Sequence, residues 1–114
     1  MRANFQLIST FQGYEIHQRE PGFEYTPIAL QKFASFVVRD EAQHLAVFAF
    51  RYSLLGLLLE GPIDEQGLLR AALQVIKQTI AAGALENRHD YTFDYRDDAF
   101  VAVRQPAWWL PSFS

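Results

Sequence analysis

The chain has 114 residues, half of them hydrophobic, which is the usual size of one domain with a single core. Its net charge is −3 and its Lys and Arg residues are scattered singly, so we expect no binding of nucleic acid or of anionic membranes. It has no cysteine, which excludes disulfides, thiol catalysis and Cys-ligated metals. Residues 1–10 lack the apolar run of a signal peptide, and together these features favour a cytoplasmic protein.

Two strands are predicted near the N-terminus, over residues 5–11 and 14–18. The second alternates, with Tyr14 and Ile16 on one face and Glu15 and His17 on the other, and the Gln12-Gly13 pair between the two strands suits a turn. The second strand places Glu15, His17 and Arg19 on one face. A Glu–His pair can act as a general base, but a solvated outer face explains the same residues. We therefore take Glu15 and His17 as candidate binding residues and assign no catalytic residue.

Residues 27–39 fit two different structures. Thr26-Pro27 suits a helix start, and the polar residues that follow fall on one helical face, which would give a short helix near 27–34. Against this, the high β propensity of Phe36, Val37 and Val38 favours a strand. The sequence leaves both alternatives open.

The most apolar part of the chain is residues 45–59. Fifteen residues are too few for a bilayer, which needs about 20, and Arg51 interrupts the run, so we interpret it as a core segment. Residues 45–52 are predicted as a strand, while 53–60 could be helix or strand. The buried side of the strand comprises Ala46, Phe48, Phe50 and Tyr52. Arg51 must reach water or a carboxylate, because an unpaired buried charge is too costly, and it is a third candidate binding residue.

The main helix is predicted over residues 64–82. Asp64 is a suitable N-cap and Gly83 a suitable C-terminal stop. Apolar residues recur with the helical period of 3.6 and form one buried stripe. These residues are Leu68, Leu69, Ala72, Leu73, Ile76 and Ile80.

A C-terminal hairpin is predicted from the alternation of Tyr91, Phe93 and Tyr95, a turn at Asp97-Asp98, and a return strand over 100–103. The three aromatic residues could be a stacking platform for single-stranded nucleic acid, but such platforms lie in basic grooves. We therefore interpret them as a stripe that faces the core.

No metal or cofactor is predicted. Two Glu-x-x-His matches, Glu41 to His44 and Glu86 to His89, have the ligand spacing of di-iron proteins, but no four-helix pattern surrounds them. The acidic residues Asp90, Asp94, Asp97 and Asp98 lack the spacing of a calcium-binding loop.

The C-terminal tail, residues 105–114, carries Trp108 and Trp109 between two prolines. This apolar patch would either fold back as a lid over the core or contact another chain. Both tryptophans are candidate binding residues.

Together the elements predict a single α+β domain over residues 1–114. We expect an antiparallel sheet of five to seven strands, the main helix packed on one face, and a C-terminal hairpin. Because many small folds share this order, fold alone does not define function. The absence of catalytic motifs favours a non-enzymatic protein-interaction or accessory domain that self-associates as a homodimer. The alternatives are a binder of a small apolar ligand in a cavity lined by Phe48, Phe50, Tyr52 and the leucines, and a hydrolase-like enzyme with a His/carboxylate pair.

Overall fold

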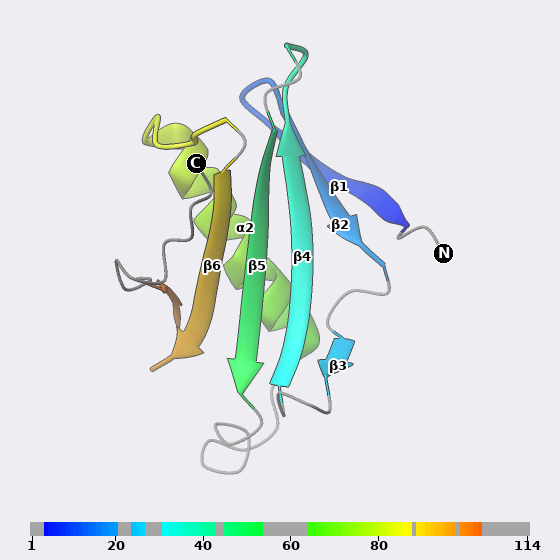
Figure 1. The fold of residues 1–114 in the computed structure, drawn as a ribbon, viewed down its shortest axis with the longest axis vertical. Coiled ribbons are helices and arrows are strands. Elements are labelled where there is room, and N and C mark those ends of the chain that lie inside the picture. The colour runs from blue at the N-terminus through cyan, green and yellow to red at the C-terminus, as the bar shows by residue number, and fades with distance from the viewer. Residues whose placement is uncertain are drawn as a thin grey trace, which may run out of the picture.

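Figure 1 shows the computed structural model of the chain, in which a seven-stranded sheet packs against the helix α2. The structure describes residues 4–20, 24–26, 31–42, 45–53, 64–87, 89–97 and 99–103. The strands are β1 Phe5–Phe11, β2 Tyr14–Arg19, β3 Glu24–Thr26, β4 Gln31–Arg39, β5 Leu45–Ser53, β6 His89–Arg96 and β7 Ala99–Ala102. They lie in the order β1-β2-β4-β5-β6-β7, and the short β3 also pairs with β4.

The predicted α+β class is confirmed, including the main helix and the C-terminal hairpin formed by β6 and β7. The expectation of a wholly antiparallel sheet is wrong at one place, because β5 and β6 are parallel. The reason is the order of elements along the chain. The helix α2, Glu65–Ala81, connects these two neighbouring strands, and a helical crossover returns the chain in the same direction.

Side-chain alternation explains β4 and β5. The buried residues of both strands have even numbers, and the predicted buried side of residues 45–52 is confirmed. Residues 31–34 belong to β4, so the alternative of a helix near 27–34 is wrong for that part, and residues 27–30 lie outside the described residues. Packing of Ala34, Phe36 and Val38 into the core outweighs the polar helical face that the same segment would form. Of residues 53–60, only Ser53 is described, and it ends β5.

The helix α2 begins and ends as predicted. The Asp64 side chain accepts a hydrogen bond from the Gln66 N–H at 3.0 Å, and Gly83 adopts a positive φ of 67° just after the helix. Its most buried side chains are Leu68, Ala72, Ile76 and Ile80, while Leu69 and Leu73 are partly buried at the edge of the core. No described helix is long and apolar enough to cross a membrane.

Aromatic rings fill the space between the sheet and the helix. Phe50 is fully buried, and its ring centroid lies 4.8–5.4 Å from those of Phe36, Phe93 and Phe100. Phe48 stacks on Phe93 and on Tyr91, so the aromatic stripe of β6 faces the core as predicted. The rings that a ligand cavity was expected to use therefore pack against one another.

Among the described residues, no helix covers the opposite side of the sheet. In Figure 1, α2 crosses behind β4, β5 and β6, and the reader looks onto the other face. We call this the helix-free face; it carries the odd-numbered residues of β2, β4 and β5, together with those paired to them on β1, β6 and β7. The large apolar side chains that are exposed among the described residues lie on it: Phe5, Leu7, Leu45 and Val101.

Candidate functional site

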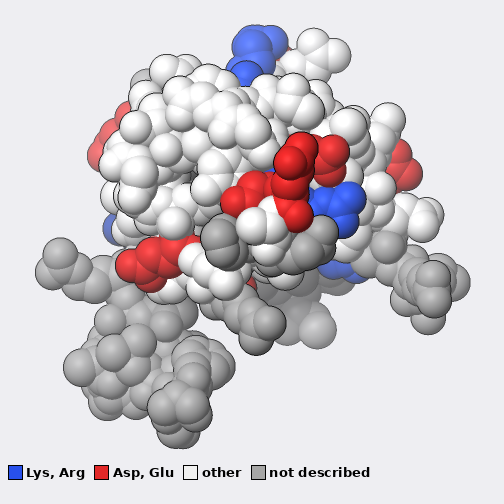
Figure 2. All heavy atoms as spheres, turned by 90° about the horizontal axis from the view of Figure 1, so that it is seen from above, with Lys and Arg blue, Asp and Glu red and all other residues white. Residues whose placement is uncertain are grey.

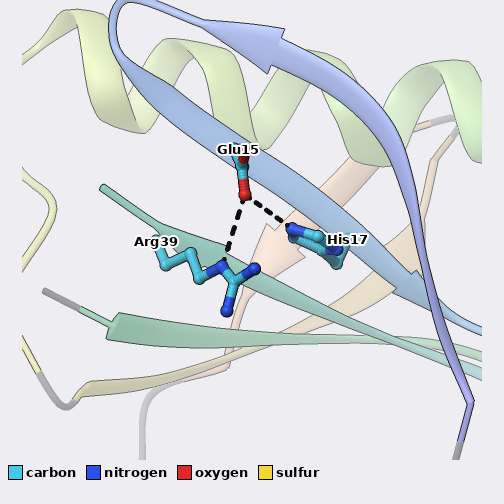
Figure 3. A network of polar contacts seen from close by, with 3 residues as sticks. All are labelled: Glu15, His17 and Arg39. Atoms are coloured by element: carbon cyan, nitrogen blue, oxygen red, sulfur yellow. Dashed lines mark hydrogen bonds and ion pairs between the residues drawn. The ribbon is translucent and has the colours of Figure 1, made fainter. Parts of the chain in front are cut away.

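Three polar side chains meet on the helix-free face, where β2 and β4 pair. Glu15 lies opposite Arg39 in the register of these strands. His17 Nε2 lies 3.0 Å from Glu15 Oε1, and Arg39 Nε donates to the same oxygen at 3.4 Å. Figure 3 shows both basic side chains directed at the Glu15 carboxylate. The sequence predicted that Glu15 and His17 share a face, and the structure places them in direct contact.

These contacts favour the ionised form of Glu15. The hydrogen bond from His17 holds the pKa of the Glu15 carboxyl below its ordinary value of 4.5, and Arg39 lowers it further, while desolvation opposes both. An ionised carboxylate only accepts hydrogen bonds, so the Nε2 atom of His17 carries the hydrogen. Because Glu15 is half exposed, we expect the network to orient the side chains more than to stabilise the fold.

Replacing Glu15 with glutamine should remove a stabilising effect that depends on pH. A carboxyl group with a lowered pKa in the folded state stabilises the protein above its unfolded value, near 4.5, and the effect is lost as the pH falls through the folded value. The free energies of unfolding of the wild type and Glu15→Gln should therefore differ at pH 6 and converge below pH 4, as urea titrations would measure. His17→Ala should reduce the difference; a difference that persists unchanged in acid would contradict the assignment.

A hollow of about 310 Å³ lies beside this network. Its lining is Phe5, His17, Val37, Arg39 and Leu45. A second hollow, of about 640 Å³, lies on the other side of the contact between Glu15 and Arg39, and is lined by more polar residues that include Thr10, Asp40 and Glu41. The site thus combines apolar walls with one positively charged group, Arg39, and one imidazole.

Arg51 lies on the same face, farther along β5. Its Nε and Nη2 atoms donate to the two carboxylate oxygens of Asp94 at 2.6 and 3.0 Å. Asp94 is the register neighbour of Arg51 on the parallel strand β6. The prediction that Arg51 must reach water or a carboxylate is confirmed. Six residues of β5 separate Arg51 from Leu45, or about 20 Å, so Arg51 does not join the Glu15 site.

Arg19 differs from the other arginines of this face. Its Nε atom is buried and has no hydrogen-bond partner among the described residues. A buried donor without an acceptor costs roughly 1–3 kcal/mol. Because this atom is enclosed by the chain itself, the missing acceptor concerns stability and not docking.

The structure places the predicted site residues in different positions. Glu15 and His17 meet, Arg51 forms a separate pair, and Trp108 and Trp109 lie outside the described residues. The sequence missed Arg39 and Asp94, whose roles follow from strand pairing.

The residues weighed as metal ligands do not gather. The His89 Nδ1 atom lies 3.4 Å from a carboxylate oxygen of Glu86, and His44 and Asp98 are outside the described residues. Within the described ranges, no group of three or more His, Asp or Glu side chains could hold a metal ion.

Charges of both signs are mixed on the surface. Seen from the end of the sheet where β4 ends and β5 begins, acidic and basic atoms lie beside one another among uncharged ones (Figure 2). No protein-family model, curated protein or solved structure matches the chain. The functional argument therefore depends on the geometry of the site.

Proposed function

We propose that this protein is a non-enzymatic interaction domain that associates with a second copy of itself through the helix-free face. The observation that carries the proposal is the gathering of exposed apolar side chains on that one face. Phe5, Leu7, Leu45 and Val101 are 39–48% exposed there, from both edge strands and from the centre of the sheet. Exposed apolar side chains gathered on one face are typical of a protein interaction site. A cytoplasmic location is part of the same proposal and is supported by composition alone.

The area of the face suits a dimer. With strands spaced by about 4.8 Å and a rise of about 3.3 Å per residue, six strands of this length present roughly 500–700 Å². A stable interface of standard size buries about 800 Å² on each partner, and the minimum for a specific interface is roughly 1,000 Å², counted over both partners. Two such faces would therefore reach the lower part of the standard range.

The charges of the face also suit a second copy. Its basic side chains pair with its acidic ones, Arg39 with Glu15 and Arg51 with Asp94. A face without a large net charge can meet its own copy without strong repulsion, whereas a partner of opposite charge would find little to bind.

Catalysis has weaker support than binding. The contact between Glu15 and His17 could orient an imidazole for acid–base chemistry. However, no described serine or threonine hydroxyl is hydrogen-bonded to His17, so the arrangement lacks the nucleophile of a hydrolase.

Replacing Leu45 with lysine should dissociate the dimer. In an isologous interface each substitution occurs twice, so two charges would have to be buried without partners. We expect the dissociation constant to rise by about a hundredfold or more, which corresponds to about 3 kcal/mol. Size-exclusion chromatography with light scattering, over a range of concentrations, should give a dimer mass for the wild type and a monomer mass for Leu45→Lys.

Ala82→Lys is the matched control, since it adds the same charge at an exposed position just after α2, on the other side of the sheet. It should keep the dimer mass. A wild-type chain that stays monomeric at all concentrations would overturn the proposal, and so would a Leu45→Lys variant with the mass of the wild type.

A further inference from the structure

A third hollow lies along α2, on the opposite side of the sheet from the helix-free face. It has a volume of about 440 Å³. The helix contributes Arg70, Leu73, Gln74, Lys77, Gln78 and Ala81, and the end of β1 contributes Phe11. The helical residues recur at intervals of three and four, so they form one stripe along the helix. This stripe is separate from the helix-free face.

The floor of this hollow is apolar and fixed. Phe11 and Leu73 are partly buried and pack against the core, so their positions depend on the fold itself. Phe11 is also held by its pairing with Tyr14 across the tight turn between β1 and β2. Such a floor can take the apolar body of a ligand without rearrangement, which reduces the entropic cost of binding.

The charged side chains that line this hollow are basic among the described residues. They are Arg70 and Lys77, and no described carboxylate lines it. Arg70 has only a long contact, 3.8 Å, with the exposed Asp64. Lys77 has no acidic partner among the described residues; its Nζ instead lies 5.9 Å from the centre of the Phe11 ring.

Most basic side chains in the described part of the chain have an acidic partner. Lys32 pairs with Glu65, and the arginines at positions 39, 51, 70 and 96 each lie within 3.8 Å of a carboxylate. Among these described residues, Lys77 and Arg19 differ from the others in this respect. The chain as a whole has a net charge of −3. A hollow lined by two cations, of which Lys77 has no acidic partner among the described residues, therefore favours the binding of anions.

We propose that this hollow binds a small organic anion with an aromatic body and one negatively charged group. The aromatic body would lie on Phe11 and Leu73, and the carboxylate or sulfonate would pair with the Lys77 ammonium. The volume lies in the range of small-molecule sites, about 300–1,000 Å³, which are mostly apolar with a few placed polar groups. This inference is independent of the association proposed for the helix-free face.

Two dyes test the proposal on the full chain. One is 8-anilinonaphthalene-1-sulfonate, an aromatic anion, and the other is N-phenyl-1-naphthylamine, which has the same ring system without the sulfonate. Fluorescence titration should show the anion binding at least about tenfold more tightly than the neutral dye. Lys77→Glu should weaken binding of the anion by at least about tenfold, because attraction becomes repulsion, and should leave the neutral dye unchanged.

Arg96→Glu is the matched control, since it makes the same change of charge at an exposed arginine on the helix-free side. We expect this variant to change the affinity for the anion by less than about twofold. Arg96 lies on the opposite face of the sheet from the hollow, and salt at 0.15 M screens its charge there. Lys77→Gln should also weaken binding of the anionic dye, and glutamine does not repel the negative end of the helix dipole as a glutamate would. Circular dichroism should show intact folding of each variant.

Three results would overturn the proposal. The first is equal binding of the two dyes by the wild type, and the second is an equal loss of affinity in Lys77→Glu and Arg96→Glu. The third is a loss of affinity for the anionic dye in Leu45→Lys together with an unchanged affinity in Lys77→Glu. This result would place the dye on the helix-free face. None of these results would alter the oligomeric mass that tests self-association.

Discussion

Replacing Phe50 with alanine is expected to lower the free energy of unfolding by about 3–5 kcal/mol, the largest effect of a single substitution in this domain. Phe50 is 0% exposed, and its ring contacts four other phenylalanine rings from β4, β5, β6 and β7. Alanine would leave a cavity where these strands and α2 meet, and the surrounding rings cannot all move into it. Urea unfolding monitored by circular dichroism would measure the loss.

Phe50→Leu is the control for this substitution. Leucine keeps most of the apolar volume, so its cost should be about 1–2 kcal/mol. A loss below about 1 kcal/mol in Phe50→Ala would contradict the position of this ring at the centre of the core.

Replacing Asp94 with alanine is expected to destabilise the protein by about 1–3 kcal/mol. The Arg51 guanidinium is two-thirds buried and makes both of its short hydrogen bonds to this carboxylate. Without Asp94 the partly buried charge would lose the carboxylate that accepts both of its hydrogen bonds. Removing the acid also breaks a side-chain contact between β5 and β6, two paired strands that are far apart in the sequence.

A double-mutant cycle with Arg51→Leu separates the pair from its surroundings. The double variant Arg51→Leu with Asp94→Ala should lose less stability than the sum of the single variants, because no charge is then left unpaired. Additive losses would mean that the two side chains do not interact, in conflict with the observed geometry.

The local parts of this fold could be predicted from the sequence. The period of residues 64–82 and the alternation of residues 45–52 concern side chains a few positions apart, so the pattern itself contains the information. The tight turn at Gln12-Gly13 was visible for the same reason, and both residues adopt positive φ there. Residues 31–34 were ambiguous because a helical and a strand pattern coincide, and only packing against the core decides between them.

The site depends on information that the sequence does not contain. Alternation places Glu15 and His17 on one face, but Arg39 reaches them only through the register of β2 with β4, across 24 positions of sequence. Likewise Asp94 becomes the partner of Arg51 only if β6 runs parallel to β5, 43 positions away. That direction could have been predicted, since a helix between two adjacent strands indicates a parallel pair.

The parallel pairing of β5 with β6 also has a consequence for synthesis on the ribosome. When residues 1–53 have emerged, β1, β2, β4 and β5 can already pair, since these strands are antiparallel neighbours close in sequence. Until residues 89–96 follow, β5 is the edge strand of this partial sheet. Phe48 and Phe50 are not yet covered by β6, and the N–H and C=O groups on the edge that later pairs with β6 have no partner. Such a border is a template for strands of other nascent chains. The strand that is best protected in the finished protein is therefore its most vulnerable part during translation.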